Sequence, residues 1–254
     1  MEKKMSRREF MKASAATGAI LMSGNPSLTF AQELKPIQLL PPQVDGGRPL
    51  MQALKDRKSS RSYSGEKIPL QVLSNLLWAG FGINRSESER PPRPWLLGGR
   101  PGRTAPSGGD SQDIDIYVAT VDGVYVYEAK TNILNPVLAE DVRSLSGRQY
   151  PGPSIPANMV SALDEAPINL IYVWDYAKPN IWNKRIEKPP KEQLMPLAFA
   201  HTAFIVQNVY LYCASEGLAT IVRIWFSKAA LTKKLNLRPE QFATLVQSVG
   251  YPRK

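Results

Sequence analysis

Apolar residues recur every three or four positions in several stretches of the chain, which is the period of an α-helix. Prolines at 49 and 69 stand where the first two of these stretches begin, and Gly217 follows the longest one, so each has a start or stop signal. The predicted helices are residues 50–57, 69 to about 82, 137–146, 194–216 and 228–235.

Strands are predicted where β-branched and aromatic residues form short runs. The turn Asp122-Gly123 joins two such runs, 114–121 and 124–127, as a hairpin. Asn169 to Trp174 is nearly all apolar, as in a buried strand, and 243–249 forms a closing strand. Helices and strands intersperse without an internal repeat, so we predict an α+β fold with a mixed sheet flanked by helices.

The first 31 residues predict an export signal. Residues 6–12 read Ser-Arg-Arg-Glu-Phe-Met-Lys, which matches the twin-arginine signature, and the apolar run 13–22 is shorter than the roughly 20 residues that span a bilayer. Small residues at 29–31 place cleavage after Ala31, unless the signal is kept as an anchor. We expect a periplasmic protein. Because this export machinery carries folded proteins, many of them loaded with a cofactor, the leader favours a bound cofactor. The alternative is a chance arginine pair before an amphipathic helix.

Residues 32–48 are rich in Pro, Gln and Gly and predict an extended arm, which leaves 49–254 as one domain. Residues 84–109 hold many Pro, Gly and Arg and predict a long loop, which in a compact domain is usually functional or mobile.

The formal net charge is +10, of which the leader carries +3. A basic surface suits nucleic acid, anionic lipid or a phosphorylated cofactor, but no basic helix or aromatic-interleaved basic strand favours nucleic acid. A single cysteine, Cys213, excludes an intramolecular disulfide, and with one histidine, His201, a zinc site is not expected. His201 lies on an apolar helix, so we interpret it as structural.

Two polar segments suit a phosphorylated, flat ligand. Residues 57–63 read Arg-Lys-Ser-Ser-Arg-Ser-Tyr, and these cations and hydroxyls suit a phosphate, although a basic helix end also complements the helix dipole. Residues 103–112 contain a glycine pair that lets backbone approach a flat ring, with Ser107 and Gln112 as hydrogen-bonding groups, or they form an ordinary turn.

Two further segments complete the pattern. Residues 207–220 run from a buried helix through Gly217 into a turn of small residues. The chain ends in Gly-Tyr-Pro-Arg-Lys, whose two cations either assist the phosphate or form a solvated tail.

The order of these motifs resembles the nitroreductase family of flavoproteins. The motifs are Arg-x-Ser-x-Arg-x-Tyr from residue 57, Thr-Ala-Pro-Ser-Gly-Gly from 104, Gln-Asn from 207 with Glu-Gly-Leu-Ala-Thr from 216, and the terminal Gly-Tyr-Pro. The resemblance covers about residues 50–254 and is strongest to exported nitroreductases, with a more distant likeness to the dehydrogenases that form azoles in peptide toxins. It implies an α+β fold and a domain-entwined homodimer with two FMN sites at its interface.

The resemblance also assigns residues to the cofactor. The FMN phosphate and ribityl chain would be held by Arg57, Lys58, Ser59 and Arg61. The isoalloxazine would lie along Pro106, Ser107, Gly108 and Asp110, some of them from the partner subunit. A turn after Leu218, formed by Val222, Arg223 and Ile224, would present a backbone N–H to the flavin N5.

This chain departs from the family pattern at two places. Asp110 stands where many members have Asn, and a carboxylate only accepts hydrogen bonds, so it must face a donor such as the flavin N3–H. The segment 84–102, with Trp95, looks longer than usual; it either covers the flavin and sets substrate choice or is surface without a role.

The function implied is an FMN-dependent oxidoreductase. It would pass hydride or electrons through flavin N5, by a ping-pong mechanism, from a small-molecule donor to a nitroaromatic, quinone or similar acceptor. No residue is assigned as a catalytic acid, base or nucleophile. The alternatives are a periplasmic binding or scaffold protein that kept the fold without turnover, and an enzyme that modifies its own flavin.

Overall fold

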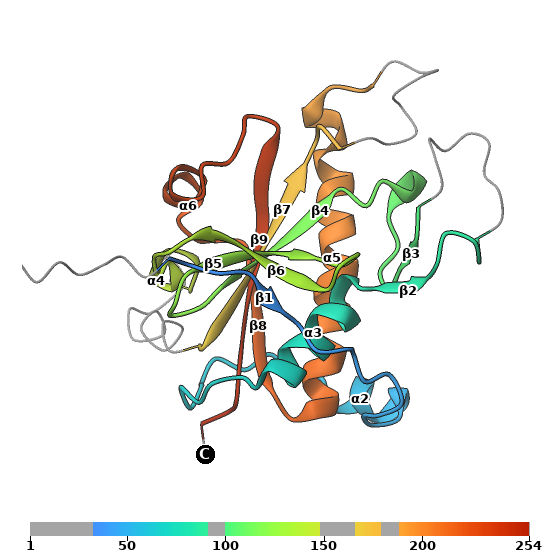
Figure 1. Ribbon diagram of the computed structural model, residues 1–254, viewed down its shortest axis with the longest axis vertical. Coiled ribbons are helices and arrows are strands. Elements are labelled where there is room, and N and C mark those ends of the chain that lie inside the picture. Colours follow the sequence, from blue (N-terminus) through green and yellow to red (C-terminus); the bar gives the residue numbers. More distant parts are fainter. Residues whose placement is uncertain (1–32, 91–99, 148–165, 179–187, 254) are drawn as a thin grey trace, which may run out of the picture. The chain divides into compact units, whose positions relative to one another are not determined.

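The computed structural model describes residues 33–90, 100–147, 166–178 and 188–253 (Figure 1). The helices are α2 (Leu50–Asp56), α3 (Leu70–Phe81), α4 (Arg143–Gly147), α5 (Lys191–Glu216) and α6 (Lys228–Lys234), with a 3₁₀ turn η1 at Gly108–Asp110. The strands are β1 (Ile37–Gln38), β2 (Ile83–Arg85), β3 (Gly102–Arg103), β4 (Ile114–Ala119), β5 (Val124–Glu128), β6 (Ile133–Leu138), β7 (Ile168–Asp175), β8 (Ala219–Arg223) and β9 (Gln241–Gly250).

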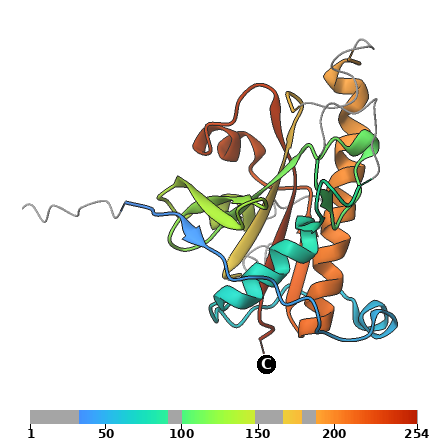
Figure 2. The ribbon, with the colours of Figure 1, turned by 45° about the vertical axis from the view of Figure 1, so that its right-hand side comes forward.

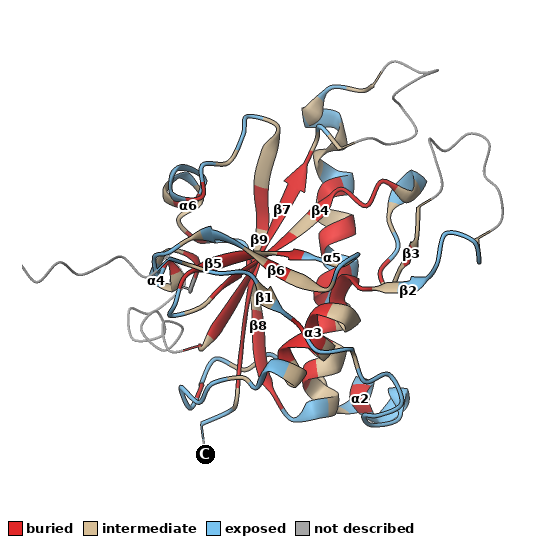
Figure 3. Cartoon of the chain, viewed as in Figure 1, coloured by how far each residue is buried: buried red, intermediate tan, exposed pale blue. Residues whose placement is uncertain are grey.

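One large sheet organises the fold, with the strand order β1-β6-β5-β4-β7-β9-β8. Within the described residues, every pairing in this sheet is antiparallel. Strand β7 lies inside it and all eight of its residues are buried (Figure 3). Strand β8 is at one edge, and this position matters for the site because an edge strand offers backbone groups to other segments.

Two layers of helices cover the two faces of the sheet (Figures 1 and 2). Leu170, Tyr172 and Trp174 of β7 pack in the larger apolar cluster, together with α3 and α5. Ile171 and Val173, which alternate with them, pack in a second cluster with α6. This alternation is the two-residue period of a strand buried on both faces.

Helix α5 is the long element to which both predicted cofactor segments attach. It ends at Glu216 and is followed by Gly217, whose φ of 71° is in the left-handed region that favours glycine. The Leu218 N–H donates to the Cys213 carbonyl at 2.8 Å. Helix α5 is long and apolar enough to cross a membrane, but the core helices of other folds have the same length and composition. In this structure α5 packs on α3 and on the sheet. Leu197 and Phe204 on α5 are 37% and 45% exposed.

The α+β class is confirmed, and so are the helices expected near 50–57, 69–82, 194–216 and 228–235 and the hairpin at the Asp122-Gly123 turn. The expected helix over 137–146 is wrong. Residues up to Leu138 belong to β6, and the helix is only Arg143–Gly147. Pro136 is compatible with β6 because, among the described residues, β1 pairs only with Ile133 and Leu134 and no other strand pairs on that side of β6.

Three further expectations are corrected. The sheet is antiparallel rather than mixed in the part of the chain described. The expected turn at 222–224 is the end of β8, and only Ile224 lies beyond it. The expected loop 84–109 contains the paired strands β2 and β3 and the turn η1. The arm contributes β1 to the sheet, and the predicted leader and Trp95 lie outside the described residues.

Candidate functional site

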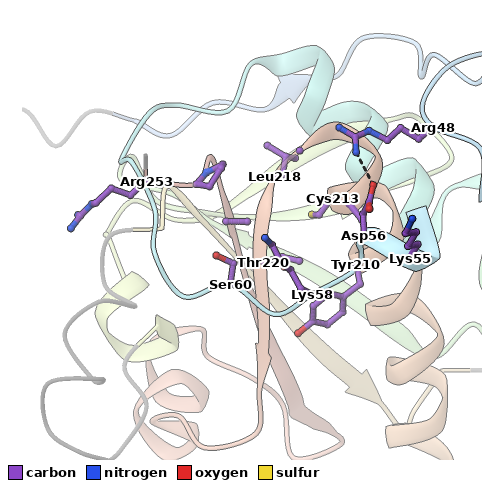
Figure 4. Close-up of a pocket in the computed structure, with 14 residues that line it drawn as sticks. Arg48, Lys55, Asp56, Lys58, Ser60, Tyr210, Cys213, Leu218, Thr220 and Arg253 are labelled. Carbon is purple, nitrogen blue, oxygen red and sulfur yellow. Dashed lines mark hydrogen bonds and ion pairs between the residues drawn. The ribbon is translucent and has the colours of Figure 1, made fainter. Parts of the chain in front are cut away.

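A cleft of about 670 Å³ lies where α2 ends, beside the C-terminal half of α5, the edge strand β8 and the last residues of the chain. This volume is within the range of about 300–1,000 Å³ that is usual for small-molecule sites. Figure 4 shows Lys58, Ser60, Tyr210 and Thr220 in the middle of the cleft, with Arg253 to one side. The cleft is therefore built from segments at both ends of the domain sequence.

Backbone hydrogen bonds hold the segment after α2 against the edge of the sheet. The Ser60 N–H donates to the Thr220 carbonyl of β8 at 2.9 Å, and the Ser64 N–H donates to the Tyr251 carbonyl at 2.9 Å. Between them the Tyr63 ring is fully buried, and its backbone forms a bridge with Pro252. The segment predicted to hold phosphate is thus extended, and it runs between β8 and the C-terminal residues.

Tyr210 connects two parts of this site. Its hydroxyl lies 3.0 Å from the Ser59 Oγ and accepts from the Val222 N–H at 3.0 Å. The Arg57 guanidinium carbon lies 5.5 Å from the centre of the Tyr210 ring, a cation–π contact. The ring is 6% exposed, so it is held on both sides by the protein.

Cations dominate the lining of the cleft. Among the described residues, the cleft is lined by one carboxylate, Asp56, and by four cations: Arg48, Lys55, Lys58 and Arg253. A hydrogen bond from Gln52 lowers the pKa of Asp56, and its 2.8 Å ion pair with Arg48 lowers this pKa further, so the carboxyl is charged at neutral pH. One of four positive charges is therefore balanced by a lining acid, and the remaining excess favours an anionic ligand.

Cys213 also borders the cleft but is fully buried. Burial raises the pKa of its thiol well above the usual range, so it is a neutral thiol and not a nucleophile.

The second predicted segment forms the turn around η1. The Gln112 N–H donates to the Ser107 Oγ at 3.0 Å, and Asp110 makes a 2.7 Å ion pair with Arg90. The other Asp110 oxygen accepts from the Gln112 side chain at 3.1 Å. Pro106 and Gly108 are exposed. Within one chain, the carboxylate expected to face a flavin donor is already bound by Arg90 and Gln112.

His201 anchors this turn to α5. The Gly108 N–H donates to its Nε2 at 2.7 Å, so Nε2 carries no proton and Nδ1 donates to the Asp113 Oδ1, also at 2.7 Å. Burial raises the pKa of Asp113, but hydrogen bonds from His201 and from the Trp174 N–H help to lower it below its usual value. His201 is 1% exposed, in agreement with a structural role.

The two predicted segments contact different levels of α5. The η1 turn packs at His201, whereas the cleft borders Tyr210, nine residues further on or about 14 Å along the helix axis. Figures 1 and 2 show η1 and α2 toward opposite ends of α5. The structure therefore does not bring both segments into one cleft within a single chain.

The family model described as the nitroreductase family matches residues 54–251. This match spans well over half of the chain and includes the four segments that carry the family resemblance, except Pro252 of the last one. The chain belongs to the nitroreductase family. Family membership and fold together make it an oxidoreductase.

Solved and curated relatives agree with this assignment. A nitroreductase candidate of Ralstonia eutropha JMP134 is 31% identical, with a TM-score of 0.69 over 87% of this chain and 91% of its own. A second nitroreductase candidate, MJ1384 of Methanocaldococcus jannaschii, is 26% identical over 178 residues, which are 68% of this chain and 76% of the relative. A chain of the E. coli microcin synthetase McbBCD complex has a TM-score of 0.55 at 17% identity and shows the fold alone.

The sequence-predicted residues of this nitroreductase are placed unevenly around the cleft. Lys58 lines it, and Arg57 and Ser59 contact Tyr210, which also lines it. Arg61 is exposed and does not line it. The Val222 N–H, expected at the flavin N5, is bound by Tyr210.

Arg223 and Ile224 also differ from the expectation. The Arg223 side chain is 4% exposed and donates to the Ser248 hydroxyl at 2.5 Å and to the Ser146 carbonyl at 3.3 Å. It is directed into the protein, away from the cleft lining. Ile224 is 45% exposed beyond the end of β8.

Several lining residues were not predicted, and they come from separate parts of the chain: Arg48, Lys55, Asp56, Ser60, Tyr210 and Thr220. Arg253 was weighed as a phosphate contact or a tail residue, and it lines the cleft. Ser60 lies in the basic segment, and Tyr210 and Thr220 lie in the motif at 207–220, so these three carried a local signal. Arg48, Lys55 and Asp56 are recognisable only once α2, α5 and β8 are packed together.

Proposed function

We propose that this nitroreductase is an FMN-dependent oxidoreductase that works as a homodimer. Its cofactor would carry hydride or electrons through N5, in a ping-pong scheme, between a small-molecule donor and a nitroaromatic, quinone or similar acceptor. The observation that carries the proposal is the cationic cleft, which is lined by Lys58 of the extended segment after α2 and by Arg253 near the C-terminus.

The residues of the cleft fit the phosphate end of FMN. A phosphate monoester is close to a dianion at neutral pH and is recognised by charge-assisted hydrogen bonds from Lys and Arg and by neutral hydroxyl donors. Lys58 and Arg253 are two of the four lining cations, and Arg57 and Ser59 contact Tyr210 beside them. Arg61 is exposed near by in sequence and remains a predicted contact.

The ring end of FMN is assigned to residues of a second copy of the chain. Pro106, Ser107, Gly108 and Asp110 do not line the cleft of their own chain, so they would contact a flavin held by the partner. Apolar residues left exposed on α2 and α5 supply a surface for such a copy: Leu50, Met51 and Leu54 on α2, and Leu197 and Phe204 on α5.

The chain's own residues would act by binding and electrostatics. The excess of positive charge in the cleft would hold the anionic cofactor and stabilise negative charge that develops on it. His201 is buried and occupied by Gly108 and Asp113, and Cys213 is a buried neutral thiol, so neither is assigned a step.

We further propose that residues 1–31 direct export to the periplasm through the twin-arginine machinery. The support is the Arg7-Arg8 pair with its apolar run and small residues before position 32. Replacing both arginines by lysine should retain the protein in the cytoplasm, as measured by cell fractionation. Periplasmic accumulation of that double variant would contradict the proposal.

The absorbance spectrum of the purified native protein tests the cofactor. We expect an oxidised-flavin spectrum that bleaches with a reductant, a chromophore with the mass of FMN, and a dimer in sedimentation. Lys58→Ala, and Arg57→Ala with Arg61→Ala, should lose the flavin, whereas Lys130→Ala, an exposed lysine in the β5–β6 turn, should retain it.

Three outcomes would contradict the proposal in different ways. A colourless, monomeric protein that does not bind added FMN would exclude a flavoenzyme. Bound flavin that no donor reduces would favour the scaffold alternative. Modified flavin recovered after exposure to oxygen would favour an enzyme that acts on its own cofactor.

A further inference from the structure

The Tyr210 hydroxyl joins two segments that both border the cleft. It is 3.0 Å from the Ser59 Oγ, in the segment after α2, and 3.0 Å from the Val222 nitrogen, in the edge strand β8. Tyr210 is 6% exposed and projects from α5 between these segments. It is also the residue whose ring lies under the Arg57 guanidinium.

The direction of these hydrogen bonds follows from the groups involved. A backbone N–H only donates, so Val222 donates to the phenol oxygen of Tyr210. The phenol has a single proton, and the Ser59 Oγ is an acceptor within reach. When Tyr210 donates to Ser59, the serine's own proton is directed away from Tyr210.

An anion at the cleft would complete this chain of donors. Ser59 lies between Lys58 and Ser60, which both line the cleft. A phosphate dianion offers only acceptors, so the Ser59 proton would be available to donate to one bound there. Each hydroxyl then donates in the same direction, from Val222 through Tyr210 and Ser59 to the phosphate, and such chains polarise one another.

We propose that Tyr210 is a positioning residue for the phosphate of the cofactor, because it orients the Ser59 hydroxyl as a donor and holds Arg57 at the rim of the cleft. This inference rests on the proposed FMN function. It assigns Tyr210 two separable parts: the hydroxyl acts on Ser59, and the ring acts on Arg57.

Two substitutions separate these parts. Tyr210→Phe removes the hydroxyl and keeps the ring beneath Arg57, whereas Tyr210→Leu removes both. Tyr212→Phe is the matched control: it lies on the same helix, its hydroxyl donates to the Val72 carbonyl at 3.3 Å, and it is not part of the cleft lining.

The experiment compares the affinities of the apoprotein for FMN and for riboflavin, measured by flavin fluorescence. Riboflavin has the same rings and ribityl chain but no phosphate, so it does not report on the phosphate contacts. Because Tyr210→Phe weakens the hydrogen bond from Ser59 to the charged phosphate, we expect it to raise the Kd for FMN by about 10-fold or more. The Kd for riboflavin should change less than about twofold, and Tyr210→Leu should weaken FMN binding further.

A double-mutant cycle distinguishes action through Ser59 from direct contact. If Tyr210 acts through Ser59, Tyr210→Phe has little further effect on FMN binding in a Ser59→Ala background. Equal losses in both backgrounds would overturn the inference, and so would equal weakening of FMN and riboflavin, which would indicate a general structural effect. If the wild-type protein binds no flavin at all, the proposed function itself fails. If the wild-type protein binds FMN but Tyr210→Phe leaves the ratio of the FMN and riboflavin affinities unchanged, only this inference fails.

Discussion

Replacing His201 by alanine tests how the η1 turn is anchored to the long helix. The substitution removes the acceptor of the Gly108 N–H and the donor to Asp113, both at 2.7 Å. Gly108 is exposed, so water can replace its lost partner. Asp113 is 6% exposed, so its carboxylate is left buried with the Trp174 N–H at 3.0 Å as a remaining partner.

The expected cost has two parts. Losing a hydrogen bond to a charged group costs about 1.5–3 kcal/mol. The space left by the imidazole, roughly 60 Å³ at about 24 cal/mol per Å³, adds about 1.5 kcal/mol. We therefore expect the free energy of unfolding to fall by about 3–4.5 kcal/mol at pH 7.

Urea unfolding followed by circular dichroism measures this change. Gln193→Ala, at an exposed position in the first turn of α5, is the control and should change the free energy by less than about 0.5 kcal/mol. In a background of Asp113→Ala, His201→Ala should cost less, because no carboxylate is left without its partner. A loss below about 1 kcal/mol, or additive losses in the double variant, would refute this account of the anchor.

The loss of stability caused by His201→Ala should depend on pH, in a direction set by the pKa of Asp113. The pKa of Asp113 is lowered in the folded protein, so the stability it contributes is fully present above the unfolded pKa of about 3.9 and is lost as the pH falls through the folded pKa. Because His201 supplies much of this lowering, the difference between wild type and His201→Ala should narrow below about pH 3.9. A difference that stays constant down to pH 2 would argue against the pairing.

Three other predictions concern the fold and the thiol. Gly217→Ala should reduce the free energy of unfolding in urea by about 1 kcal/mol, because the φ of 71° strains an alanine even though no atom obstructs its Cβ. Gly46→Ala should change it little, because Gly46 has open space around it and no positive φ. Ile205→Ala should cost about 2–5 kcal/mol in the same assay, because Ile205 is fully buried between α3 and the sheet. Cys213 should not react with a thiol reagent at pH 8 in the native protein and should react at once in urea, because burial raises its pKa; rapid native labelling would contradict this.

Local patterns along the sequence were sufficient for most of the helices and for the first hairpin. Apolar spacing of three to four residues and the flanking proline or glycine are short-range features, so 70–81 and 191–216 could be predicted within a few residues. The basic segment after α2 was also found this way, because its cations and hydroxyls are adjacent in the chain. The family resemblance relied on the order of such local motifs, and the match over residues 54–251 confirms it.

Pairings between distant segments decided the rest. Residues 222–224 were expected to form a turn, but residues 219–223 form strand β8, which pairs with β9 along the edge of the sheet. Residues 133–138 become β6 through their pairing with β5, despite Pro136. Arg48, Lys55 and Arg253 reach one cleft because α2, α5 and the C-terminal residues pack together. Sequence periodicity indicates which face of a helix or strand is buried, but packing across the whole domain decides which neighbour buries it. The residues that line the cleft therefore could not be predicted from the sequence. The separation of the two predicted flavin segments along α5 also required the tertiary structure.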